Sequence, residues 1–161
     1  MSVSPLIAAA AGEFHMNTRC LQRAVNGLSH EQWLACPDRA NSIAWLAGHA
    51  LWSRQALVRR LGGSWNYPGL EPFARGAKPG PTTVYLTPET FLSAWQQSDD
   101  IVATTLESLT PEALAAPAPP GPPAPDGKVS GFIGALAWHE TYHLGQIAYL
   151  RCWLGQTALF G

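Results

Sequence analysis

Hydrophobic residues recur at intervals of three and four positions in four long segments of the chain, which predicts one apolar face on each of four α-helices. The segments span about residues 5–26, 41–62, 87–109 and 130–154. No stretch alternates apolar and polar residues for long enough to predict a sheet. The pattern therefore predicts an all-α fold that is built as a four-helix bundle.

Polar residues just before these segments predict where the helices begin. Ser4-Pro5, Asn41-Ser42 and Thr87-Pro88 are typical helix starts. A short polar side chain there caps the first backbone N–H groups, and the first turn of a helix tolerates proline. Residues 29–32 (SHEQ) have the spacing of a capping box, so we expect a short helix between the first two long ones.

Two of the expected connections are long. Residues 62–86 are too many for a tight hairpin, so we expect this stretch to cross the bundle or to wrap over one end. Residues 116–127 (APAPPGPPAPDG) are rich in proline and predict an extended, exposed loop that carries no chemistry. The bundle is thus expected to have long crossover connections.

Composition narrows the classes of partner. The 161 residues suit one domain that spans residues 1–161. Charged residues make up only 13% of the chain, against about 25% in typical globular domains, which favours a homodimer or a large apolar groove. The net charge is -1 and the basic residues form no stripe, so nucleic-acid binding is not expected.

The sequence also argues against a membrane-spanning protein and against a protein stabilised by disulfide bonds. No apolar run reaches the roughly 20 residues that a membrane-spanning helix needs, so no membrane partner is expected. The three cysteines are odd in number and lack CxxC spacing, which argues against a disulfide framework and against a thiolate zinc site. Reduced thiols in a cytoplasmic protein are the expected state.

Three histidines occupy positions that are predicted to face the core. His139 and His143 lie four residues apart on the apolar stripe of the last helix, so their rings stack one above the other and can bind one ion. His49 lies in the middle of the stripe on the second long helix. A buried imidazole costs free energy unless its nitrogens are satisfied, and one cation would satisfy all three rings. Three protein ligands with open coordination positions are typical of a catalytic metal site.

Two other interpretations compete for these histidines. A single histidine on an apolar stripe is more often a hydrogen-bonded core residue than a ligand. The segment 139–143 also matches the zinc-metalloprotease motif H-E-x-x-H, in which the glutamate is the general base. Such enzymes usually take their third ligand from downstream, but no His, Asp or Glu follows His143. The third ligand must then come from upstream, which favours His49.

At these residues the sequence resembles the DinB-like superfamily of metal-dependent enzymes. The resemblance covers nearly the whole chain and is strongest over two motifs, with a weaker similarity at residues 14–21. The two motifs are His139-Glu140-x-x-His143-x-Gly145-Gln146-Ile147-x-x-Leu150-Arg151 and Ser42-Ile43-Ala44-Trp45-Leu46-Ala47-Gly48-His49. The resemblance implies a four-helix bundle with crossover connections, which is frequently a homodimer. It also implies a zinc, nickel or iron ion held by three histidines, which correspond to His49, His139 and His143.

Relatives of this kind include thiol-dependent transferases and isomerases. The resemblance therefore implies a metal-dependent enzyme that acts on small molecules, as a thiol-dependent S-transferase that uses a low-molecular-weight thiol or as a hydrolase. The alternative is a non-catalytic metal-binding or structural helical bundle. Four residues are candidates for holding a ligating histidine or walling the pocket: Glu140, Gln146, Trp45 and Trp52. The alternatives are a neighbouring helix or solvent for Glu140, a helix contact for Gln146 and ordinary core packing for the tryptophans.

Overall fold

Side-chain caps at Ser42 and Thr87 set the beginnings of two of the long helices, as the sequence predicts. The computed structural model describes residues 3–38, 40–77 and 85–159. Ser42 Oγ accepts a hydrogen bond from the backbone N–H of Trp45, and Thr87 Oγ1 accepts one from that of Thr90. The predicted capping box is present, with Ser29 and Gln32 each bonding the other's backbone.

The described residues form helices and no strand, so the predicted all-α fold class is confirmed. The long helices are α1 (Ala8–Val25), α3 (Ile43–Arg60), α4 (Pro88–Glu107) and α6 (Val129–Trp153). Four short helical segments complete the fold: η1 (Pro5–Ile7) precedes α1, and α2 (His30–Leu34), η2 (Glu71–Phe73) and α5 (Pro111–Ala115) lie in the connections between the long helices. Helix α5 is an addition to the elements that the sequence predicts, although Thr110-Pro111 repeats the start signal of α4. None of the described helices is both long and apolar enough to span a bilayer.

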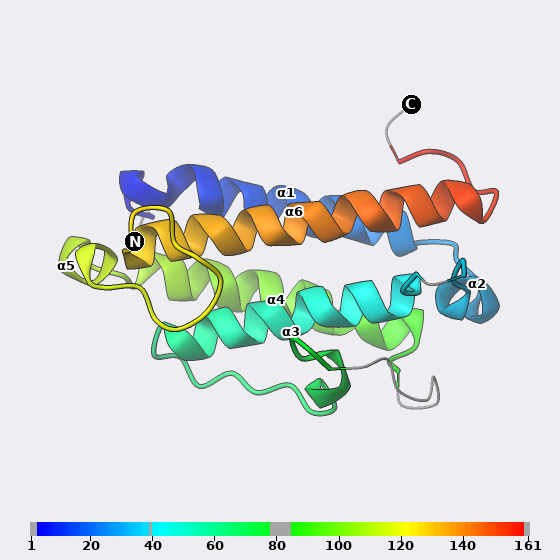
Figure 1. Ribbon diagram of the computed structural model, residues 1–161, viewed down its shortest axis with the longest axis horizontal. Coiled ribbons are helices and arrows are strands. Elements are labelled where there is room, and N and C mark those ends of the chain that lie inside the picture. The colour runs from blue at the N-terminus through cyan, green and yellow to red at the C-terminus, as the bar shows by residue number, and fades with distance from the viewer. Residues whose placement is uncertain (1–2, 39, 78–84, 160–161) are drawn as a thin grey trace.

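The four long helices form a bundle with an unusual order (Figure 1). Helices α1 and α3 each pack against both α4 and α6, so α1 lies diagonally opposite α3 and α4 diagonally opposite α6. Helices α1 and α6 run in one direction, and α3 and α4 run in the other (Figure 1). The connection from α3 to α4 must therefore return along the bundle, and its turn η2 packs against α3. The two diagonal crossings lie at opposite ends.

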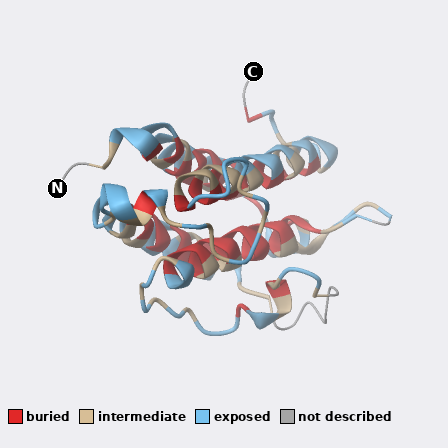
Figure 2. Cartoon of the chain, turned by 60° about the vertical axis from the view of Figure 1, so that its left-hand side comes forward, coloured by how far each residue is buried: buried red, intermediate tan, exposed pale blue. Residues whose placement is uncertain are grey.

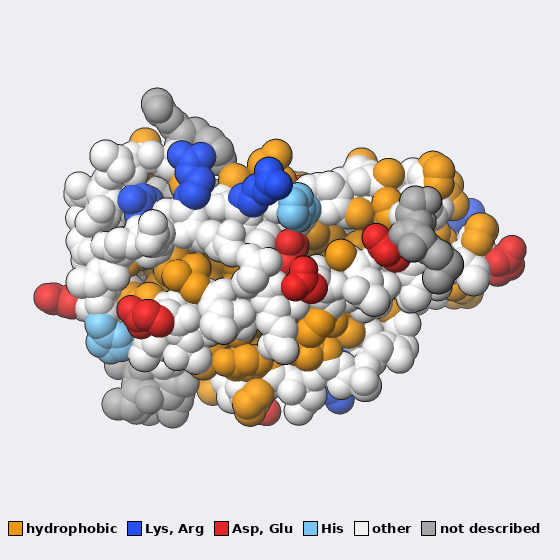
Figure 3. All heavy atoms as spheres, turned by 180° about the vertical axis from the view of Figure 1, so that it is seen from behind, with side chains coloured by type: hydrophobic (Ala, Val, Ile, Leu, Met, Phe, Trp, Pro, Cys, Tyr) orange, Lys and Arg blue, Asp and Glu red, His pale blue; other side chains and the backbone are white. Residues whose placement is uncertain are grey.

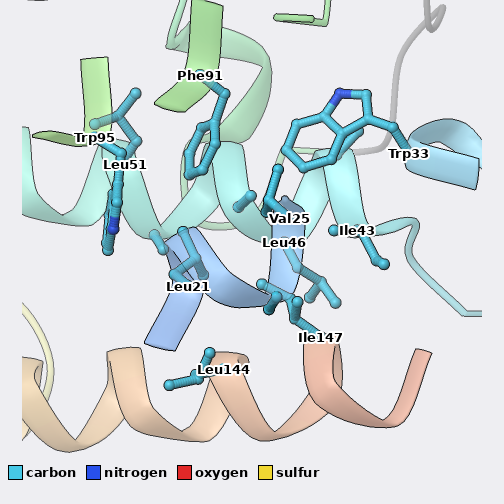
Figure 4. Packing of buried hydrophobic residues seen from close by; sticks show 14 of the residues in the cluster. Leu21, Val25, Trp33, Ile43, Leu46, Leu51, Phe91, Trp95, Leu144 and Ile147 are labelled. Carbon is cyan, nitrogen blue, oxygen red and sulfur yellow. The ribbon is translucent and has the colours of Figure 1, made fainter. Parts of the chain in front are cut away.

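Buried residues line the inward faces of the long helices (Figure 2) and form two hydrophobic clusters. In the first cluster, side chains from α1, α3, α4 and α6 point toward one another, and Trp33 of α2 closes the end (Figure 4). The second cluster lies nearer α5 and includes Phe14, Leu57, Leu106 and Phe132. Seen from behind, the surface carries scattered charged side chains with hydrophobic atoms exposed between them (Figure 3).

A buried polar layer separates the two clusters and contains one residue from each long helix. These residues are Thr18, Arg54, Ser98 and Glu140. Arg54 donates from Nε to Glu140 Oε2 at 2.7 Å and from Nη2 to Glu140 Oε1 at 2.8 Å, which is a bidentate pair. Its remaining N–H groups bond Ser98 Oγ at 3.0 Å, Thr18 Oγ1 at 2.9 Å and a backbone carbonyl of α1. The guanidinium thus ties all four long helices together.

Removing the carboxylate should destabilise the whole bundle. We expect Glu140→Ala to lower the free energy of unfolding by about 3–5 kcal/mol, because it removes the bidentate partner of the buried Arg54 guanidinium and leaves only Asp99 Oδ1, 3.8 Å from Nη1, as a carboxylate partner among the described residues. Replacing the exposed carboxylate of Asp100 on α4 with alanine should change stability by less than about 0.5 kcal/mol. Urea denaturation of the two variants and the wild type measures both effects. A Glu140→Ala protein as stable as the wild type would show that the pair does not hold the helices.

Candidate metal centre

The three predicted histidines meet at the seam between α3 and α6, which are antiparallel neighbours. His49 lies near the middle of α3, and His139 and His143 lie on adjacent turns of α6. Each histidine offers one nitrogen, and these atoms all lie within 4.8 Å of one another. The Nε2 atoms of His139 and His143 are 3.0 Å apart. The structure therefore brings together, from two helices, the residues that the sequence singles out.

Hydrogen bonds on the far side of two rings decide which nitrogen faces the cluster. His49 Nδ1 lies 2.6 Å from the carbonyl oxygen of Phe73, and His143 Nδ1 lies 2.7 Å from Gln146 Oε1. Both partners are acceptors, so both Nδ1 atoms must carry the proton and donate it. Each Nε2 is then left with a free lone pair, which is the form of imidazole that binds a metal ion.

The donor set fits one divalent ion. Because Nε2 of His49 and Nε2 of His143 both carry lone pairs, a proton on His139 can satisfy only one of them. The Nδ1 atom of His139 is also buried and has no hydrogen-bond partner among the described residues. Nitrogen ligands of a tetrahedral zinc ion with bonds of 2.0–2.1 Å lie about 3.3 Å apart, which falls between the observed 3.0 and 4.8 Å. A single cation would accept a lone pair from one nitrogen of each of the three rings.

The surroundings keep these imidazoles neutral. Burial lowers the pKa of His49, His139 and His143 below the ordinary value for histidine. The pKa of His139 falls to about 4, because burial is reinforced by the neighbouring histidines and by the positive charge of Arg75. Neutral rings are the metal-binding form, so the cluster is ready to bind an ion at neutral pH.

Two tryptophans stack on the ring of His49, and of the two Trp52 also lines the cleft beside the cluster. The Trp45 ring is stacked on His49 with centroids 5.2 Å apart, and the Trp52 ring lies on it with centroids 5.6 Å apart. Both tryptophans come from α3, one turn before and one turn after the histidine. The stacking restricts rotation of the imidazole and shields it from water on two faces.

A cleft of about 940 Å³ opens beside His49 and His139. Its walls come from α3, from the first half of α6 and from the proline-rich loop between α5 and α6. The lining includes Trp52, Arg60, Arg75, Pro122, Leu136 and Trp138. A small molecule in this cleft would lie directly against the histidine cluster.

The family model of the DinB superfamily matches residues 13–147 of this chain. The chain belongs to the DinB superfamily. The matched region contains all three histidines, so the resemblance drawn from the two histidine motifs is confirmed. No curated protein matches this chain.

One expected neighbour of the ion in this DinB-superfamily chain lies elsewhere. Glu140 is 2% exposed, and its carboxylate binds Arg54 in the polar layer instead of lining the cleft. It follows His139 directly, and one residue turns a helix by about 100°, which directs the carboxylate into the bundle. A general base must reach the reacting proton, so the metalloprotease interpretation of H-E-x-x-H is wrong for this chain. Gln146, by contrast, lies beside the cluster, with its Oε1 atom 2.7 Å from His143 Nδ1.

The proline-rich loop is exposed or half-buried throughout, as the sequence predicts, and its residues Gly121, Pro122, Pro123 and Pro125 also line the cleft. Its base is closed by backbone hydrogen bonds from Ala118 to Gly127 at 2.9 Å and from Val129 to Ala116 at 3.0 Å. Asp126 then accepts from the backbone N–H of Lys128 and the hydroxyl of Ser130 at the start of α6. The Asp126-Gly127 turn was the sequence signal for this closure.

The lowered histidine pKa values predict how acid affects the metal-free protein. Between about pH 6.5 and pH 4, histidines of the unfolded chain bind protons, whereas His139 in the folded protein stays neutral. Protons therefore favour the unfolded chain, and the free energy of unfolding should fall as the pH is lowered through this range. Urea denaturation of chelator-treated protein at about pH 7.5, 6 and 5 measures this slope.

Two histidine variants test the origin of that slope. His139→Gln should make stability less dependent on pH, because the residue that resists protonation is gone. His30→Gln removes an exposed histidine on α2 and should leave the wild-type slope unchanged. Equal slopes in the wild type and in His139→Gln would contradict the assignment.

Proposed function

We propose that this protein binds one divalent transition metal ion, such as zinc, nickel or iron, through His49, His139 and His143, and that it is an enzyme acting on small molecules. The observation that carries the proposal is the convergence of three neutral imidazoles at the edge of a cleft of about 940 Å³. A site with three protein ligands that opens onto a cleft is typical of catalysis, whereas structural metal sites are closed by four protein ligands.

The residues of the chain prepare the site for the ion. The Phe73 carbonyl and the Gln146 side chain fix the tautomers of His49 and His143, and the stacked tryptophans keep His49 in place. When bound, a divalent ion supplies Lewis acidity, which polarises a carbonyl or lowers the pKa of a coordinated water or thiol.

The charges of the cleft favour transfer over hydrolysis. Among the described residues that line the cleft there is no carboxylate, and Glu140 is engaged by Arg54. A metal-assisted hydrolase commonly uses a carboxylate to take the proton from water. A small-molecule thiol brings its own nucleophile and ionises readily beside a cation. These observations support a thiol-dependent S-transferase as the specific form of the proposal.

Metal content is the first test. We expect purified, tag-free wild-type protein to contain about one equivalent of a transition metal and His139→Ala to contain almost none, because two ligands hold the ion too weakly. His30→Ala, which changes an exposed histidine outside the cluster, should keep the wild-type content. Elemental mass spectrometry measures all three proteins.

The same proteins then test catalysis. Metal-loaded wild type is screened with small thiols against electrophiles and with hydrolysable esters and amides, beside His139→Ala. If no metal binds even after loading with zinc, nickel and iron, the histidines are hydrogen-bonded core residues and the bundle is structural. If metal binds but thiols do not and no substrate turns over, the protein is a metal-binding module without catalysis.

The hydrogen bond from Gln146 should strengthen metal binding. Gln146→Leu removes the acceptor that fixes the His143 tautomer, so zinc affinity should fall by about 10–100-fold. Gln146→Glu keeps an acceptor oxygen and should retain most of the affinity. Gln97→Leu, an exposed glutamine on α4, serves as the control. Competition with a chromophoric chelator measures the affinities, and an unchanged value for Gln146→Leu would rule out this role.

A further inference from the structure

The cleft beside the histidines is apolar along its walls and positively charged at two places. Trp52, Leu136 and Trp138 contribute apolar surface, and the proline-rich loop adds more on the opposite side. The charged residues in its lining are Arg60 and Arg75. Among the described residues, neither guanidinium forms an ion pair. Two unpaired cations in an apolar cleft favour a ligand that carries negative charge.

The two arginines lie at different ends of the cleft. Arg60 follows His49 by eleven residues on α3, which places it on nearly the same face of the helix and about 16 Å farther along the axis. Ser53 and Ala56 lie between them and line the same cleft. Arg75 lies at the histidine end, close enough for its charge to act on His139. The cleft is therefore elongated, with the histidines at one end and Arg60 at the other.

The proline-rich loop closes in on the Arg60 end. A Cβ atom built on Gly121 would lie 2.8 Å from the Phe132 ring and 3.8 Å from Arg60 Cζ, so the backbone of the loop passes very close to both side chains. Glycine is the residue that permits this approach. Arg60 is itself exposed, so the loop lies beside the guanidinium without shielding it from water.

We propose that this cleft binds a small organic acid with an aromatic or aliphatic body, whose acidic group lies at Arg60 and whose other end reaches the histidine cluster. The inference rests on the proposed function only for the reaction at that second end. The apolar walls and loop contact the body of the ligand, and Arg60 selects its charge. Arg75 adds positive charge where the reacting group would lie.

Binding of a matched pair of probes tests the proposal. 4-Phenylbutyrate and 4-phenylbutyramide have nearly the same shape but differ in charge. We expect chelator-treated wild type to bind the acid about tenfold more tightly than the amide, because hydrogen bonds to charged groups are the stronger ones. Isothermal titration calorimetry measures both affinities. Metal-free protein is used so that coordination of the carboxylate by an ion does not contribute.

Neighbouring arginines provide the variant and its control. Arg60→Gln should abolish the preference for the acid while leaving the affinity for the amide unchanged. Arg59→Gln changes an exposed arginine that does not line the cleft and should keep the wild-type preference. Equal affinities for acid and amide in the wild type, a preference that survives Arg60→Gln, or no binding of either probe would each overturn the proposal. None of these outcomes bears on whether the three histidines bind metal.

A loop variant separates the apolar contribution from the charge. Pro122→Gly combined with Pro123→Gly loosens the loop and removes two apolar side chains from the cleft. We expect both probes to bind several-fold more weakly, with their ratio unchanged because Arg60 is intact. Unchanged affinity for both probes would overturn the part of the proposal that gives the loop contact with the ligand.

Discussion

The buried pair between Arg54 and Glu140 is the interaction on which the rest of this structure depends. It joins α3 to α6 across the interior, and the remaining guanidinium hydrogens reach α1 and α4. Because each side chain makes several short hydrogen bonds, neither helix can rotate or slide without breaking some of them. Fixing α3 and α6 in this way also fixes the seam between them, where His49 and His139 meet.

Adjacent residues of α6 consequently serve different purposes. His139 faces the cleft, and Glu140, about 100° farther round the helix, faces the bundle interior. In a metalloprotease the same letters would place the glutamate beside the ion as the general base. Here Arg54 of α3 binds the carboxylate of Glu140. The motif in this chain therefore contributes two histidines to the cluster and one carboxylate to a structural ion pair. The short motif alone does not distinguish these arrangements, because the difference lies in what faces the glutamate.

The order of the helices in turn builds the cleft. Since α4 and α6 lie on a diagonal, their connection has to cross one end of the bundle, and the proline-rich loop is part of that crossing. The loop ends at the antiparallel bridge between Pro117 and Lys128, which returns the chain to the start of α6. Proline limits the conformations that the loop can adopt in the unfolded chain. Ordering this loop therefore costs less conformational entropy than ordering a loop of ordinary composition. The polar layer fixes how the helices are positioned along one another, and the connection from α4 to α6 forms one wall of the cleft.

The sequence by itself determined the four long helices, the caps of α3 and α4 and the helix faces on which the three histidines lie, because helical periodicity and capping depend on residues only three or four positions apart. It also contained the family motifs around His49 and His139. Only the tertiary structure decided that Glu140 pairs with Arg54, 86 residues away, and that the Phe73 carbonyl orients His49 from 24 residues away. The same holds for Arg60 and the proline-rich loop, which share a cleft only after the bundle closes. Such partners are chosen by helix packing and chain crossings, which local sequence patterns do not encode.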